Sequence, residues 1–253
     1  FIDMTDVLVF ARFGRYGSPG PVATCHCLNL PPSEPGYYFW RDEATGRMTR
    51  RSEWFISRSP TVSVNEHAVR YLVSFALPRF CNRTLVRSRK AQLYERATAG
   101  WISKLDTVVH ELYHIDPGYS GIRPVEREDG SCSTSVHSPE FFSRVAEMVS
   151  EYLDSGPDPG VYDFLRHDFD ALTRRHGGVL GTCFRPFPSY PQRSLERLVP
   201  QPVTLDPALA DVEVAPWREL RRATLYTEQQ LHVRQFFEAS SCQRLEKRQR
   251  RAA

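Results

Sequence analysis

The sequence predicts an α+β fold in which strands come first and helices follow, and three observations support this prediction. The N-terminal part contains short runs of β-branched and aromatic residues between stretches of turn composition. From about Lys90 the apolar residues recur at steps of three and four, which is the period of an amphipathic helix. After Gly178 the chain is extended and punctuated by proline, so we expect an irregular C-terminal extension.

The strands are predicted in residues 6–13, 22–30 and 61–80. The first two are joined by GRYGSPGP, a stretch of turn composition, so we expect them to pair as a hairpin. The third strand is centred on RYLVSF and is followed closely by Pro78. Proline has no amide hydrogen to donate to a neighbouring strand, so Pro78 indicates an edge strand or the end of a strand.

Three helices are predicted. The first covers residues 101–115 and is ended by the Pro-Gly pair that follows. The second begins with Ser138 as its N-cap and with Pro139 at its first helical position. The third lies within residues 159–178, with Gly177 at its end.

The first helix carries the stretch TVVHELYHIDPG, which contains the pattern His-Glu-x-x-His. Residues four apart lie on one face of a helix, so His110 and His114 can offer two imidazoles to one metal ion. Glu111 is next to the first of them and can act as general base toward a water on that ion. Zinc lowers the pKa of such a water toward about 7, which provides a nucleophile at neutral pH. The pattern therefore predicts a Zn²⁺ site with Glu111 as its catalytic residue.

A catalytic zinc ion needs a third protein ligand, and the residues leave two candidates for it. The metzincin pattern fails, because the position six residues after His114 is Ser120 and not histidine. His137 precedes the second helix and offers an imidazole. Glu140, in the first turn of that helix, has three candidate roles. It can be the ligand itself, a carboxylate that orients the imidazole of His137, or an acid favoured by the helix dipole.

The stretch HELYHIDP, a glycine-bearing loop and then HSPEFF resemble a phage and bacterial metallopeptidase family. They are also similar to the SprT-like zinc proteases, in which a histidine in an HGPEF-like stretch follows HExxH. The resemblance covers about residues 60–155 and is strong over 107–142. It implies a minimal zincin-like fold, with a small, mainly antiparallel sheet packed on the active-site helix and a second helix. It also implies a catalytic base, Glu111, and three zinc ligands: His110, His114 and His137.

The sequence departs from the SprT-like pattern in two respects. Ser138 stands where that family usually has glycine. The sequence also has no C-x-x-C pair from which a zinc ribbon of the kind many SprT-like proteins carry could be built. The second departure weakens the case for a role in DNA repair.

Two residues after the first helix are candidates for supporting roles. Asp116 can either orient a metal ligand from behind or cap the helix end and the following turn. Tyr119 can donate a hydrogen bond to the oxyanion that develops during hydrolysis. Tyr113 is a weaker candidate for that role, because helical geometry points it away from the two histidines.

We expect residues 1–177 to form a zincin-like metallopeptidase domain. Residues 178–253 have few periodic apolar stretches, so we expect them to pack on that domain as a proline-rich extension. The expected anchors are aromatic residues between its prolines: Phe184, Phe187 and Tyr190. The basic end of the chain, from about Gln243, is expected to be a solvated tail, with contacts to nucleic acid as the weaker alternative.

Composition narrows the class of protein. The 253 residues are 41% apolar and 25% charged, with a net charge of +3, which is ordinary for a soluble globular protein and does not require a nucleic-acid partner. No run of apolar residues is long enough for a transmembrane helix. The start resembles no signal peptide and lacks an initiator methionine, so the natural N-terminus is left open. The six scattered cysteines favour a reducing, cytoplasmic setting.

Three functions compete at this point. The leading hypothesis is a zinc-dependent peptidase acting on a protein or peptide. The second is a zinc-containing binding protein without turnover, but a purely structural site has no use for the carboxylate of Glu111. The third is a nucleic-acid-associated protein that uses the basic tail, with the metal site subordinate.

Overall fold

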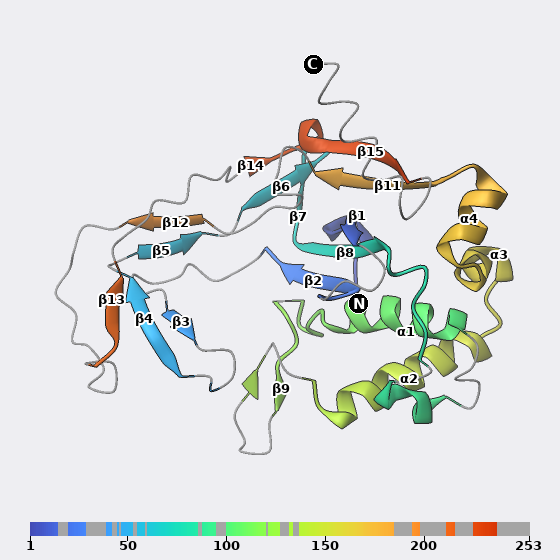
Figure 1. The fold of residues 1–253 in the computed structure, drawn as a ribbon, viewed down its shortest axis with the longest axis horizontal. Coiled ribbons are helices and arrows are strands. Elements are labelled where there is room, and N and C mark those ends of the chain that lie inside the picture. Colours follow the sequence, from blue (N-terminus) through green and yellow to red (C-terminus); the bar gives the residue numbers. More distant parts are fainter. Residues whose placement is uncertain are drawn as a thin grey trace.

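The computed structural model describes residues 1–14, 20–28, 39–41, 45, 47–52, 55–58, 60–85, 88–94, 100–119, 121–126, 132–133, 137–184, 194–197, 211–215 and 225–236. The predicted α+β class is confirmed, since helices and several small sheets are both present. The helices gather on one side of a central sheet (Figure 1). In the part of the chain that is described, no helix is long and apolar enough to cross a membrane.

The central sheet has the strand order β1-β8-β2, formed by Val7–Gly14, Tyr71–Pro78 and Ala23–Cys27. β8 pairs with β1 in parallel and with β2 in antiparallel register, so the sheet is mixed. The hairpin predicted between the first two strands is wrong, because β8 lies between them. All but one of the residues of β8 are buried, as expected for a strand with neighbours on both sides. Pro78 is the last residue of this central strand, so it marks a strand end and not an edge.

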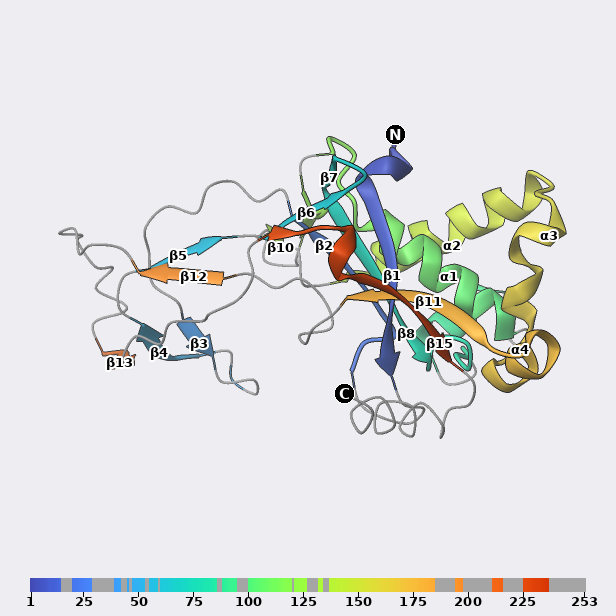
Figure 2. The same ribbon diagram turned by 90° about the horizontal axis from the view of Figure 1, so that it is seen from above.

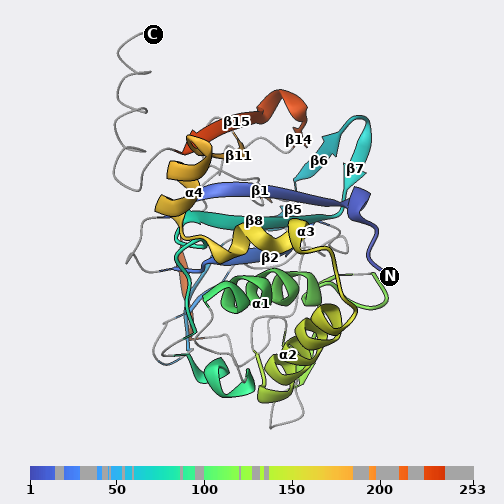
Figure 3. The same cartoon turned by 90° about the vertical axis from the view of Figure 1, so that its right-hand side faces the viewer.

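Two helices lie below the sheet. α1 (Gly100–Tyr113) packs against β2 and against α2 (Pro139–Asp154). Figure 3 shows this order of layers, with β2 the strand nearest α1 and α2 on the far side of α1. The predicted start of α2 is confirmed, because Ser138 Oγ accepts a hydrogen bond from the amide of Phe141 at 3.2 Å and proline is the first helical residue. The apolar face of α2 turns toward the core through Phe141, Val145, Ala146 and Val149.

The predicted third helix is divided into α3 (Pro159–Tyr162), a 3-10 segment (Asp163–Arg166) and α4 (Phe169–His176). α4 begins anew because the side chain of Asp168 accepts a hydrogen bond from the amide of Ala171 at 2.7 Å. Gly177 ends α4 in the left-handed conformation, with φ of 70°, as predicted. Buried Lys104 of α1 connects this region to α1. Its ammonium donates hydrogen bonds to the backbone carbonyls of Leu165, in the 3-10 segment, and of His167, which follows it.

The described parts of the C-terminal extension are more regular than expected, since they are mostly strands. β11 (Val179–Phe184) and β15 (Leu231–Phe236) pair with each other, and β11 lies against β1. Phe184 is buried edge-to-face on Phe10, with ring centroids 5.1 Å apart. Phe236 is fully buried in the core that contains Ala11 and Leu77. The other expected anchors, Phe187 and Tyr190, and the basic tail from Gln243 lie outside the described residues.

Strands from both halves of the chain also form small sheets. Those that contain residues 55–58 and 48–52 lie at the end of the molecule away from the helices (Figure 2), whereas the one that contains residues 61–64 packs beside the central sheet. β12 (Ser194–Arg197) pairs with β5 (Phe55–Arg58). β13 (Glu213–Ala215) pairs with β4 (Met48–Ser52), which also pairs with β3 (Phe39–Arg41). β14 (Leu225–Tyr226) pairs with β6 (Thr61–Val64), which also pairs with β7 (His67–Val69). The shortest pair is β9 (Val125–Glu126) with β10 (Cys132–Ser133), in the segment between α1 and α2.

Candidate metal centre

The structure brings together three histidines from two elements. His110 lies in the last turn of α1 and His114 directly follows that helix, where its amide still donates to the carbonyl of His110 at 3.3 Å. His137 immediately precedes the N-cap of α2. One ligand nitrogen from each lies within 4.8 Å of the others, and the Nε2 atoms of His114 and His137 are 3.0 Å apart. Nitrogens about 2.0–2.1 Å from one tetrahedral ion lie about 3.4 Å from each other, so this group could bind a metal ion.

The surroundings keep these imidazoles uncharged. Burial lowers the pKa of His110 to about 2, with a further contribution from the positive charge of Lys90. Burial also lowers the pKa of His114 to about 4, and it lowers the pKa of His137. All three rings are therefore neutral at pH 7, which is the form of imidazole that binds metals.

A buried ion pair stands behind His110. The ammonium of Lys90 contacts a carboxylate oxygen of Asp106 and lies 3.4 Å from Nδ1 of His110. The hydroxyl of Tyr94 donates to the other oxygen of Asp106 at 2.7 Å. Burial lowers the pKa of Lys90, and the neighbouring Asp106 opposes that shift. This group was not predicted from the sequence, although Asp106 precedes His110 by four residues and therefore shares its helix face.

Glu111 is almost completely buried, with 5% of its surface exposed, and it is turned toward β2. Its carboxylate accepts a hydrogen bond from the backbone amide of Cys25 in that strand. Burial raises the pKa of Glu111 to about 7, and the charges of Lys90, Arg12 and Arg83 partly oppose the shift. The carboxylate is therefore able to exchange a proton near neutral pH.

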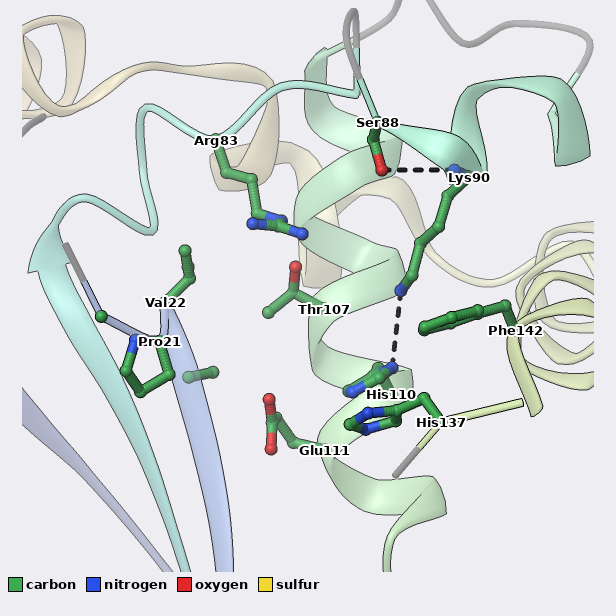
Figure 4. A pocket seen from close by; sticks show the side chains of 12 residues that line it. Pro21, Val22, Arg83, Ser88, Lys90, Thr107, His110, Glu111, His137 and Phe142 are labelled. Atoms are coloured by element: carbon green, nitrogen blue, oxygen red, sulfur yellow. Dashed lines mark hydrogen bonds between the residues drawn. The ribbon is translucent and has the colours of Figure 1, made fainter. Parts of the chain in front are cut away.

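Two of the three histidines, His110 and His137, line one cavity of about 620 Å³ together with Glu111. Figure 4 shows α1 as its floor, Pro21 and Val22 on one side, and Lys90, Phe142 and His137 on the other. The size suits a site that binds part of a ligand. The full lining in the described chain is Gly20, Pro21, Val22, Ala23, Arg83, Ser88, Lys90, Thr107, His110, Glu111, His137 and Phe142.

Of the two candidates for the third ligand, the structure brings His137 to His110 and His114. Glu140 is exposed in the first turn of α2. Its pKa is lowered by hydrogen bonds from its own backbone amide and from the hydroxyl of Ser138. This placement matches an acid favoured by the positive end of the helix dipole.

Asp116 and Tyr119 belong to a turn and are not among the described residues that line the cavity. A carboxylate oxygen of Asp116 accepts a hydrogen bond from the amide of Gly118 at 2.8 Å, which is the turn-capping role. The hydroxyl of Tyr119 donates to the carbonyl of Asp3 at 3.0 Å, and its ring packs on that of Tyr71 with centroids 5.2 Å apart. Tyr119 is thus used to hold the N-terminal turn, and the structure does not bring it to the histidines.

No known protein family matches the chain, and no curated protein or solved structure was found to be similar to it. The resemblance to the SprT-like proteases therefore remains a prediction from the motifs HELYH and HSPEF. The three histidines and Glu111 are the observations on which a function must be argued.

Proposed function

We propose that this protein is a zinc-dependent metallopeptidase that hydrolyses peptide bonds in a protein or peptide substrate. The observation that carries the proposal is a group of three neutral imidazoles, two of which line one cavity with a buried carboxylate. Imidazole alone would be enough for a binding site, but a carboxylate with a pKa near 7 is what a hydrolase needs as a general base.

His110, His114 and His137 would hold the ion. Three nitrogen ligands that leave a fourth position open are typical of catalytic zinc, and the donor set fits that group. When bound, the ion supplies a Lewis acid that polarises the peptide carbonyl and makes water more acidic. We therefore propose zinc as the metal. From the scattered cysteines we also propose a reducing, cytoplasmic setting as the place of action.

Glu111 would be the general base. It follows the first ligand on α1, and its carboxylate is held by the backbone amide of Cys25 on the opposite side of the cavity. From this position it would take a proton from the attacking water and deliver that proton to the leaving amine. The reacting bond would then lie between α1 and β2, where Glu111 can reach it.

Two arginines hold the wall that faces α1. Arg12 donates from Nη2 to the carbonyl of Pro21 at 2.7 Å, and Arg79 donates to the carbonyl of Gly20. These hydrogen bonds tie the segment before β2 to β1 and to the residue after β8, and the segment lines the same cavity as Glu111. A fixed wall favours catalysis, since a small displacement of the bound substrate is costly in rate.

The test combines zinc content with cleavage of a broad set of internally quenched peptides. Glu111→Gln is expected to keep zinc and to lower kcat by about 10²–10⁴-fold, which is the usual contribution of a general base. His114→Ala is expected to lose both zinc and activity. Glu147→Gln is the matched control, because that glutamate is 60% exposed on α2 and should have no effect.

Two outcomes would contradict the proposal. Full activity in the Glu111→Gln protein would remove its role as general base. A wild-type protein that binds zinc at one equivalent but cleaves none of the peptides would instead favour the zinc-containing binding protein.

A further inference from the structure

One cation of the cavity makes no ion pair in the part of the chain that is described, although its charge acts on the carboxylate of Glu111. Of the two cationic side chains in the described lining, Lys90 is paired with buried Asp106, which lies behind the metal centre. For the other, Arg83, the structure gives no ion pair in the part of the chain it describes. Its Nε is completely buried and has no hydrogen-bond partner there. A buried donor without a partner is costly, since it loses its hydration and gains nothing in return, so the protein itself satisfies this guanidinium poorly.

The main chain at Arg83 is well anchored. The amide of Arg83 donates to the carbonyl of Phe80 at 3.1 Å, and its carbonyl accepts a hydrogen bond from Ser103 Oγ at 2.8 Å. Phe80 and Leu85 on either side are buried in the core. The guanidinium is therefore presented from a fixed base, and a ligand need not order this segment before it binds.

The guanidinium also lines the same cavity as His110, Glu111 and His137. Figure 4 shows it above Thr107, on the side of α1 that carries Glu111. Thr107 precedes His110 by three residues, which corresponds to about 4.5 Å along a helix axis. One residue of an extended peptide spans about 3.3–3.6 Å. A group that binds Arg83 would thus belong to a residue next to the bond held at the histidines.

We propose that Arg83 is a substrate-recognition residue that binds a carboxylate of the peptide next to the bond to be cleaved. The planar fork of a guanidinium matches a carboxylate in two parallel hydrogen bonds. The carboxylate can come from an aspartate or glutamate side chain or from the C-terminus of a short peptide. Binding of nucleic acid is less favoured. A protein usually contacts a phosphate backbone through several exposed cations, whereas Arg83 is a single cation recessed beside Glu111.

This inference rests on the proposed peptidase function for its cleavage assay, so its test also includes a binding assay that needs no turnover. The cleavage assay uses peptide mixtures with free and with amidated C-termini, and the cut positions are read by mass spectrometry. The wild-type protein is expected to cut next to aspartate or glutamate, or one residue before a free C-terminus. Loss of cutting on amidation identifies the C-terminal carboxylate, and unchanged cutting identifies the side chain.

The variants separate recognition from folding. Arg83→Gln is expected to lower kcat/KM for acidic peptides by about 10-fold or more, since a hydrogen bond to a charged group contributes about that factor. It should leave the zinc content unchanged and should lower kcat/KM for acidic peptides more than for neutral ones. Arg83→Glu should reverse the preference toward lysine and arginine, which loss of structure alone cannot do. Arg174→Gln, at an exposed position in α4, is the matched control.

The binding assay follows the fluorescence anisotropy of a labelled acidic hexapeptide and its neutral amide counterpart on zinc-loaded Glu111→Gln protein. If the acidic peptide binds more tightly and Arg83→Gln abolishes the difference, the inference holds even where no peptide is cleaved and the peptidase proposal fails. Equal binding of both peptides overturns the inference. Tighter binding of a single-stranded oligonucleotide that depends on Arg83 also overturns it, in favour of phosphate recognition.

Discussion

The buried pair Lys90–Asp106 provides a strong test of how the active-site helix is stabilised. Asp106 is fully buried, the side chain of Lys90 is 9% exposed, and Tyr94 donates to the same carboxylate at 2.7 Å. Asp106→Ala leaves an ammonium buried without its counter-ion, which typically costs about 3–5 kcal/mol. The hydroxyl of Tyr94 also loses its hydrogen-bond acceptor, and this cost is included in the same range. We therefore expect the free energy of unfolding to fall by about 4 kcal/mol.

The assay is urea unfolding of the metal-free protein, so that zinc binding does not contribute to the measured stability. Replacing the whole group by apolar residues, in a Lys90→Met, Asp106→Leu and Tyr94→Phe triple variant, should restore most of the loss, because no charge is then left unpaired. The control is Asp163→Ala, which removes an exposed pair with Arg166 of 3.2 Å and should cost less than about 1 kcal/mol. A loss below about 1 kcal/mol for Asp106→Ala would refute the reasoning.

The remaining predictions concern the ligands, pH and the C-terminal strands. His137→Ala should lower zinc affinity by more than about 100-fold in a competition titration, whereas Glu140→Ala should leave it unchanged; the reverse result would restore the glutamate as ligand. Metal-free protein should lose stability as pH falls below about 6.5, because each histidine with a lowered pKa takes up its proton only when the protein unfolds. Each such histidine should lower the free energy of unfolding by about 1.4 kcal/mol per pH unit. The raised pKa of Glu111 has the opposite effect between about pH 7 and 4.5, because the folded protein takes up that proton first. Glu111→Gln should therefore make the loss of stability with falling pH steeper. A free energy of unfolding that does not change with pH in either protein would contradict this. A chain ending at Gly178 loses buried Phe236, which contributes about 1.5–3 kcal/mol on its own, so its melting temperature should fall; unchanged stability would make the extension an independent appendage.

Local signals in the sequence predicted the helical part of the site well. The period of three and four located α1, and the Ser138–Pro139 start located α2, so the approach of His137 to His110 depended only on how the two helices pack. A pattern of this kind is visible because helix contacts repeat within one turn of the chain. The ion pair behind His110 was less visible, since Lys90 reaches it from a 3-10 segment (Arg89–Leu93) that has no sequence period of its own.

Contacts distant in sequence were not predictable in the same way. Arg83 enters the cavity from the segment after β8, and nothing in its neighbours marks it as different from the other arginines of the chain. Strand pairing has the same difficulty, because short apolar runs such as β1 and β2 indicate strands but not partners. The turn composition between them suggested a hairpin, and the more apolar β8 took the central place instead.

That insertion of β8 has a direct consequence for the site. With β8 between its neighbours, β2 becomes an edge strand, and one side of its backbone is left to face α1 instead of another strand. The amide of Cys25 on that side is then available to Glu111, and the segment before β2 becomes a wall of the cavity. The pKa of Glu111 is therefore set by its neighbours in β2 and around the cavity, and not only by the His-Glu-x-x-His pattern that identifies the residue.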